Sequence, residues 1–140
     1  MNRGMAATVV LGLACAGGAW AADPMTIGQI EYENSCVQCH GPAGKGDGPM
    51  AVVLKNGAPD LTRLQADNGE VFPVSKVYAL IAGDGITGAH GSQEMPAWGF
   101  RYRVNAPSMV GPFGTAEDER AFVRGRILAL IDYIASLQEQ

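Results

Sequence analysis

Histidine, cysteine, lysine and long apolar runs are all scarce in this sequence. Only two histidines and three cysteines occur among its 140 residues, too few for a disulfide framework and without the second ligand pair of a structural zinc site. Acidic residues outnumber basic ones by 14 to 10, which gives a formal net charge of −4. This balance argues against nucleic acid and anionic membrane surfaces as partners, because both are bound through basic patches.

The first residues have the pattern of an export signal. Arg3 is basic, residues 5–19 are apolar or small, and Ala19-Trp20-Ala21 has the small-x-small pattern of a cleavage site. We therefore expect residues 1–21 to be a signal peptide and residues 22–140 to form one domain in the periplasm. No run approaches the roughly 20 apolar residues of a membrane-spanning helix, so no membrane span is expected. Cys15 leaves a lipid anchor open as an alternative.

The remaining pattern predicts short helices joined by long irregular segments, without a strand or an internal repeat. One helix is expected over residues 24–35, with Ile27, Ile30 and Tyr32 as its apolar members, and another over residues 75–82. Residues 41–60 and 83–91 are rich in glycine and proline and read as irregular chain, with one or two helical turns at residues 50–55.

The last helix is the clearest element of the sequence. Residues 115–118 have the character of a capping box. Apolar residues then recur at steps of four and three, namely Val123, Ile127, Leu130, Ile134 and Leu137. The segment between Trp98 and Thr115 reads as a loop.

The chemistry of the chain is concentrated in Cys36-Val37-Gln38-Cys39-His40. Two thiols at this spacing can add to the two vinyl groups of a haem, and the adjacent histidine is then held under the iron. A thioredoxin-like redox pair would need a strand before the motif, and a zinc site would need more ligands. The motif therefore predicts one covalently bound haem c, attached through Cys36 and Cys39 with His40 on the iron. Such a group also fills a core that short helices alone cannot close.

Two further spacings make the chain resemble the class I c-type cytochromes. In that family a glycine and an aromatic residue precede the first cysteine at intervals of four, as Gly28 and Tyr32 precede Cys36 here. They pack against a leucine and a tyrosine three apart on the last helix, which Leu130 and Tyr133 match. The resemblance spans residues 26–137 and implies an all-α fold of short helices and long loops wrapped around one covalently bound haem.

The resemblance also implies how His40 is oriented. In the family a backbone carbonyl in the following loop, usually that of a proline, accepts a hydrogen bond from the ring nitrogen that faces away from the iron. Pro59 is the candidate here, and Pro49 is the second choice. The segment 98–115 looks like an added loop relative to the shorter members. Its Arg101 and Arg103 are candidates for pairing with the haem propionates, with solvation in water as the alternative.

Met95 is the expected sixth ligand of the iron. A thioether is neutral and soft, which suits iron in a pocket of low dielectric constant. Met95 is followed by Pro96, which fixes the backbone, and it lies where the family has a Met-Pro pair. Three side chains compete: His90, in a glycine-rich run; Met109, after the added loop; and Met50, which we expect in the core.

These assignments predict an electron-transfer protein and no enzyme. Methionine and histidine together would leave no open position for a substrate. The expected partners are a donor dehydrogenase and an acceptor oxidase or reductase, which dock transiently, and the protein is either a free carrier or a dehydrogenase subunit. Because the lysines are only Lys45, Lys55 and Lys76, a basic partner or a mainly apolar contact is expected. The alternative is a haem sensor or small redox enzyme with an open sixth position.

Overall fold

The computed structural model describes residues 24–83, 95 and 98–139, and these residues form helices and no strand. The signal peptide predicted for residues 1–21, Cys15 and His90 lie outside the described residues. In chain order the helices are α1 (Ile27–Ser35), α2 (Val37–His40), α3 (Val74–Ala82), α4 (Trp98–Val110) and α5 (Ala116–Ser136), with three short 3-10 turns, η1 (Ala51–Val53), η2 (Leu61–Arg63) and η3 (Ala66–Asn68). Within these ranges no helix has the length and apolar character to cross a membrane.

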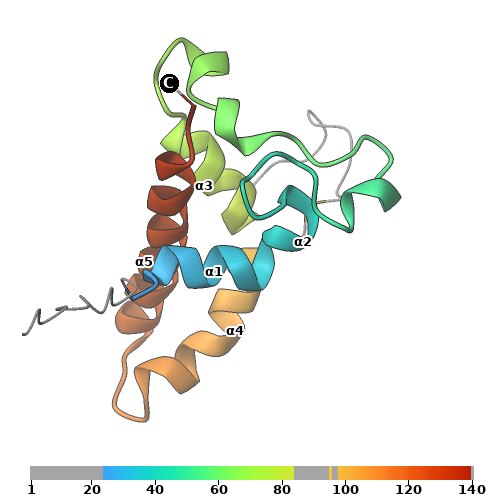
Figure 1. Cartoon of the computed structure of the whole chain (residues 1–140). Helices are drawn as coiled ribbons and strands as arrows, with labels where there is room; N and C mark the ends of the chain where they lie inside the picture. The colour runs from blue at the N-terminus through green and yellow to red at the C-terminus, as the bar shows by residue number, and fades with distance from the viewer. Residues whose placement is uncertain (1–23, 84–94, 96–97, 140) are drawn as a thin grey trace, which may run out of the picture.

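The longest helix, α5, is the element against which the others pack. It begins as predicted, with a capping box in which the Thr115 hydroxyl accepts from the backbone N–H of Asp118 and the Asp118 carboxylate accepts from the backbone N–H of Thr115. In Figure 1, α1 crosses α5, while α3 and α4 pack along it. The side chains that α5 buries in the core are Ile127, Leu130, Ile131 and Ile134.

The crossing of α1 and α5 is close because α1 presents a glycine there. A Cβ atom at Gly28 would lie 2.7 Å from the carbonyl carbon of Ala129, so only glycine fits. The rings of Tyr32 and Tyr133 pack beside it, with centroids 5.2 Å apart at a tilt of 56°. This confirms the contact that the spacing of Gly28, Tyr32, Leu130 and Tyr133 predicts.

The apolar members expected for α1 are correct only for Tyr32. Ile27 and Ile30 are 52% and 40% exposed, and the buried positions are instead 28, 31, 32 and 35. The helical period explains this difference. Once Gly28 faces α5, the residues three, four and seven positions later share its side, and positions 27 and 30 turn away.

The added loop predicted between Trp98 and Thr115 is wrong, because most of it forms α4. The buried face of α4 consists of Gly99, Tyr102 and Ala106, which recur at helical spacing. Gly99 lies against the backbone of Ala82, at the end of α3. The helix also contains Pro107, whose missing N–H removes one backbone hydrogen bond.

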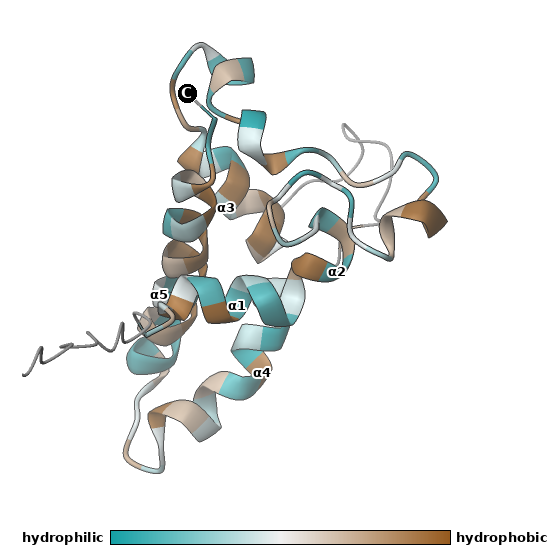
Figure 2. Cartoon of the chain, in the orientation of Figure 1, coloured by the Kyte–Doolittle hydropathy of each residue, from teal (hydrophilic) through white to brown (hydrophobic). Residues whose placement is uncertain are grey.

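Met50 is not a core residue, contrary to the expectation. Its side chain is 47% exposed, and in the following turn η1 only Ala51 is buried, while Val52 and Val53 are 86% and 68% exposed. In Figure 2 this apolar turn lies at the end of the loop that follows α2, away from α5. The molecule thus presents apolar side chains to the outside on the part of the chain that follows the cysteine motif.

Candidate functional site

The motif residues are brought together by a single turn of helix. Cys36 ends α1 and begins α2, and its carbonyl accepts from the backbone N–H groups of Cys39, at 3.1 Å, and His40, at 2.9 Å. Both cysteines are free thiols. Cys36 and His40 are buried and Cys39 is half-buried. Burial raises the pKa of the Cys36 thiol to about 12.

The loop after α2 folds back onto the carbonyl groups that the short helix leaves unpaired. The backbone N–H of Gly46 donates to His40 at 2.8 Å, that of Gly48 donates to Cys39 at 3.1 Å, and that of Met50 donates to Gln38 at 2.7 Å. Gly48 lies so close that a Cβ atom there would be 2.6 Å from a carbonyl oxygen of α2. The glycine-rich composition of this segment is therefore a requirement of the close approach.

His40 is oriented by the bond that the family resemblance predicts. Its Nδ1 lies 3.0 Å from the carbonyl oxygen of Pro59, and Nδ1–H donates to that oxygen. Pro59 is therefore the partner, and the second choice, Pro49, is not. With the proton on Nδ1, Nε2 keeps its lone pair. Burial lowers the pKa of His40, against a smaller opposing effect of the bond to Pro59, so the neutral ring is favoured, which is the form that binds metal.

The chain segment that carries Pro59 is held in place by the C-terminal end. The side chain of Gln138 donates to the carbonyl of Leu61 at 2.8 Å and accepts from the backbone N–H of Gln65 at 2.9 Å. The backbone N–H of Glu139 donates to the carbonyl of Thr62 at 2.9 Å. The orientation of the histidine therefore depends on contacts with residues that follow α5.

These observations fit a covalently attached haem. Two thiols and a neutral imidazole lie within one turn, and exposed apolar side chains follow them on the next part of the chain. In the described ranges no group of three or more histidine, cysteine, aspartate or glutamate side chains could hold a metal ion by itself.

The candidates for the sixth ligand are only partly within the described residues. Met95 is described and its side chain is 40% exposed, while Pro96 and His90 lie outside these residues. Met50 and Met109 are 47% and 58% exposed. Met95 stays a prediction.

The two arginines considered for the propionates have separate surroundings. The Arg101 guanidinium donates to the hydroxyl of Ser35, directly before the motif, and lies 5.8 Å from the centroid of the Trp98 ring. Arg103 lines a cavity formed by α3, α4 and α5. Arg101 is thus the one that borders the motif.

Sequence reasoning missed a partly buried ion pair between α1 and α5. Glu31 is 7% exposed and accepts from Arg126 at 3.0 Å. The available signal was position, since Glu31 is three residues after Gly28 and therefore lies on the same face of α1. The ion pair links α1 to α5 near Cys36.

The comparison with protein families finds a match that covers most of the chain. The model of the family described as Cytochrome c matches residues 26–138. No curated protein and no solved structure matches the chain significantly.

Proposed function

Because the chain belongs to the cytochrome c family, we propose that it is a periplasmic electron-transfer protein with one haem c and no catalytic site of its own. The family supports haem-based electron transfer. The observation that carries the proposal for this chain is the hydrogen bond from His40 Nδ1 to Pro59, at 3.0 Å, because it leaves the other ring nitrogen free for iron.

Each residue of the motif has a separate role in this proposal. Cys36 and Cys39 hold the macrocycle through thioether bonds, and His40 is the ligand on one side of the iron. Met95 is the ligand on the other side. When bound, the haem supplies an iron that takes up and releases one electron. The protein keeps the cofactor attached, excludes water and keeps the His40 ring in one orientation through Pro59.

Residues 1–21 are the signal peptide and residues 22–140 the exported domain in this proposal. The partners are a donor dehydrogenase and an acceptor oxidase or reductase. The exposed apolar side chains of Met50, Val52 and Val53 favour a small contact that forms and dissociates quickly. A subunit of a larger dehydrogenase would use the same residues.

The experiment that tests this function is the addition of carbon monoxide to the reduced, haem-loaded protein. A carrier with both axial positions filled does not bind carbon monoxide at neutral pH. Rapid binding by the unmodified protein would contradict the proposal and support the alternative, a haem sensor or small redox enzyme with an open sixth position.

The variant Met95→Ala tests the ligand. We expect the far-red sulfur-to-iron absorption band to disappear, the potential to fall, and binding of carbon monoxide to appear together, because a neutral, soft ligand has been removed. Met109→Ala is the matched control, since this methionine is exposed on α4 and its loss should change none of the three. A band that survives in Met95→Ala would transfer the role to Met50 or Met109.

A further inference from the structure

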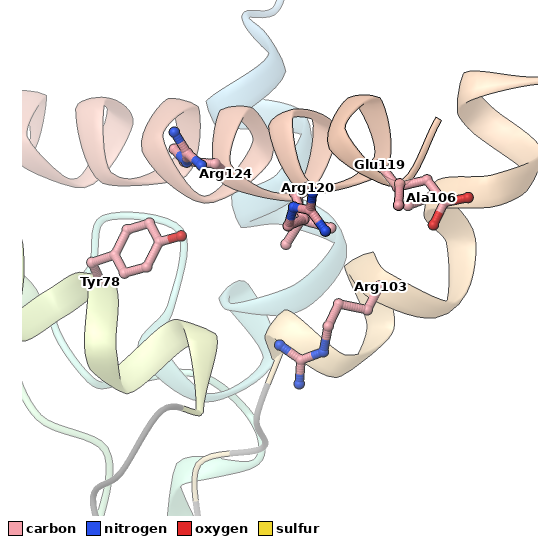
Figure 3. A pocket seen from close by; sticks show the side chains of 8 residues that line it. Tyr78, Arg103, Ala106, Glu119, Arg120 and Arg124 are labelled. Atoms are coloured by element: carbon pink, nitrogen blue, oxygen red, sulfur yellow. The ribbon is translucent and has the colours of Figure 1, made fainter. Parts of the chain in front are cut away.

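The cavity that Arg103 lines lies away from the cysteine motif, where α3 and α4 meet the first half of α5. Its volume is 380 Å³, and its polar lining consists of Tyr78, Arg103, Glu119, Arg120 and Arg124. Figure 3 shows Arg120 and Arg124 on α5, Arg103 on α4 and Tyr78 on α3. Neither a residue of the motif nor Met95 lines this cavity, so it is separate from the proposed haem site.

The charge of the lining is positive in a chain that is negative as a whole. The lining contains three arginines, all of them exposed, and one carboxylate residue, Glu119. Arg120 is paired with Glu117 at 2.7 Å, outside the lining. Among the described residues no carboxylate lies within ion-pair distance of Arg103 or Arg124. Two cationic side chains are therefore available to a ligand.

Two of these arginines, both exposed, repel each other weakly along α5. Arg120 and Arg124 are four residues apart on α5, a spacing at which like charges repel each other. Arg103 adds a third positive charge from α4. A doubly charged anion would reduce this repulsion, and its charge would match the two guanidinium groups, those of Arg103 and Arg124, that no described carboxylate pairs.

Chemistry and size together restrict the class of ligand. A guanidinium group presents a planar fork of donors that binds the two oxygens of a carboxylate or phosphate, and the Tyr78 hydroxyl adds one more donor. Pockets for small molecules range over about 300–1,000 Å³. A cavity of 380 Å³ is at the small end of that range, which suits a compact anion and excludes a large cofactor.

We propose that this cavity binds a compact dianion that carries carboxylate or phosphate groups. Arg103 and Arg124 bind its oxygens from α4 and α5, and Tyr78 donates to it from α3. Because α3 and α4 are the helices that flank residues 83–97 in the sequence, the bound anion ties together the two helices on either side of Met95.

The test is calorimetric titration of the haem-loaded protein at low, constant ionic strength, with inorganic phosphate in one arm and succinate in the other. Binding of one equivalent in either arm supports the proposal, and the arm that binds more tightly assigns phosphate or dicarboxylate chemistry. Absence of binding in both arms at about 10 mM anion, which is about ten times a Kd of about 1 mM, would overturn the proposal.

Variants separate a specific site from general charge attraction. We expect Arg103→Gln combined with Arg124→Gln to weaken binding at least 10-fold, and Glu119→Gln to strengthen it, because that change removes the one opposing carboxylate. Arg63→Gln is the matched control, since Arg63 is exposed and paired with Asp67 outside the cavity. An equal loss of affinity in Arg63→Gln would overturn the proposal. Unchanged absorption spectra and helicity establish that the variants are folded.

Discussion

Replacing Gly28 by alanine tests the packing of α1 against α5 most directly. The added Cβ atom would overlap the carbonyl oxygen of Ala129 and lie 2.9 Å from the Cβ atom of Tyr133. Both neighbours are fixed, one as backbone and the other as the first atom of its side chain, so no change of rotamer relieves the contact. The two helices must therefore separate.

The expected size of the effect is a difference between two terms. Overpacking costs about 1–3 kcal/mol, and a contact that involves backbone belongs at the upper end, at about 3 kcal/mol. The better helix propensity of alanine returns about 1 kcal/mol. The net loss is about 2 kcal/mol, which lowers the midpoint of urea unfolding by about 1 M at a typical dependence of about 2 kcal/mol per molar urea.

Gly125→Ala is the control for this experiment, because it makes the same chemical change in a helix. Gly125 lies within α5, and no heavy atom beyond its own helix neighbours lies within 4 Å of a Cβ atom placed there. Only the propensity term applies, so this variant should be more stable by about 1 kcal/mol. The assay is urea unfolding of the haem-loaded proteins followed by circular dichroism. If Gly28→Ala were as stable as the unmodified protein, the reasoning on the close crossing would be refuted.

Two further predictions concern side chains that form hydrogen bonds to neighbouring residues. Tyr32→Phe removes the hydrogen bond from the buried Tyr32 hydroxyl to the carbonyl of Gly41, at 2.6 Å. The free energy of unfolding should fall by about 1–2 kcal/mol in the same assay, because a buried acceptor loses its donor. An unchanged midpoint would show that water replaces the hydroxyl. Asp118→Asn tests the cap of α5. The hydrogen bonds from Thr115 lower the pKa of Asp118 in the folded protein. The charged carboxylate therefore stabilises the fold fully above its ordinary pKa of about 3.9, and this stabilisation is lost as the pH falls through the lower pKa of the folded state. The difference in unfolding free energy between Asp118→Asn and the unmodified protein should thus be largest at neutral pH and decrease in acid. A difference that does not change with pH would contradict the stabilising role of the Asp118 charge.

The elements that were predicted correctly are those whose pattern lies within a short stretch of the sequence. The capping box at Thr115 and the repeat of apolar residues along α5 need no knowledge of a partner helix. The contact of Gly28 and Tyr32 with the last helix was predicted from spacings that the family shares. The bond from His40 to Pro59 was predicted from the proline carbonyl that the family has in the loop after the motif. The role of Met95 as an iron ligand was inferred from the proline that follows it and from the family's Met-Pro pair, and it stays a prediction.

The parts that the sequence did not predict depend on tertiary contacts. α4 buries Gly99, Tyr102 and Ala106, of which two are too small to give an apolar signal, and its arginines and proline read as loop residues. The ion pair of Glu31 with Arg126 was missed because each residue alone looks like a solvated charge. Only the crossing of α1 and α5 brings the two together and buries Glu31.

The same crossing has a consequence for the order of events as the chain folds. Glu31 and Arg126 are 95 residues apart, so the contact between the first and the last helix closes a loop that contains about two thirds of the 140 residues. Such long-range contacts form slowly, because the entropy of loop closure is lost before the contact gives any stability. Until the last helix arrives, α1 lacks its largest packing partner, and we expect the Cys36 thiol, which is 5% exposed in the folded chain, to be open to solvent. The late contact therefore keeps the cysteine accessible to chemical modification while the chain is still incomplete.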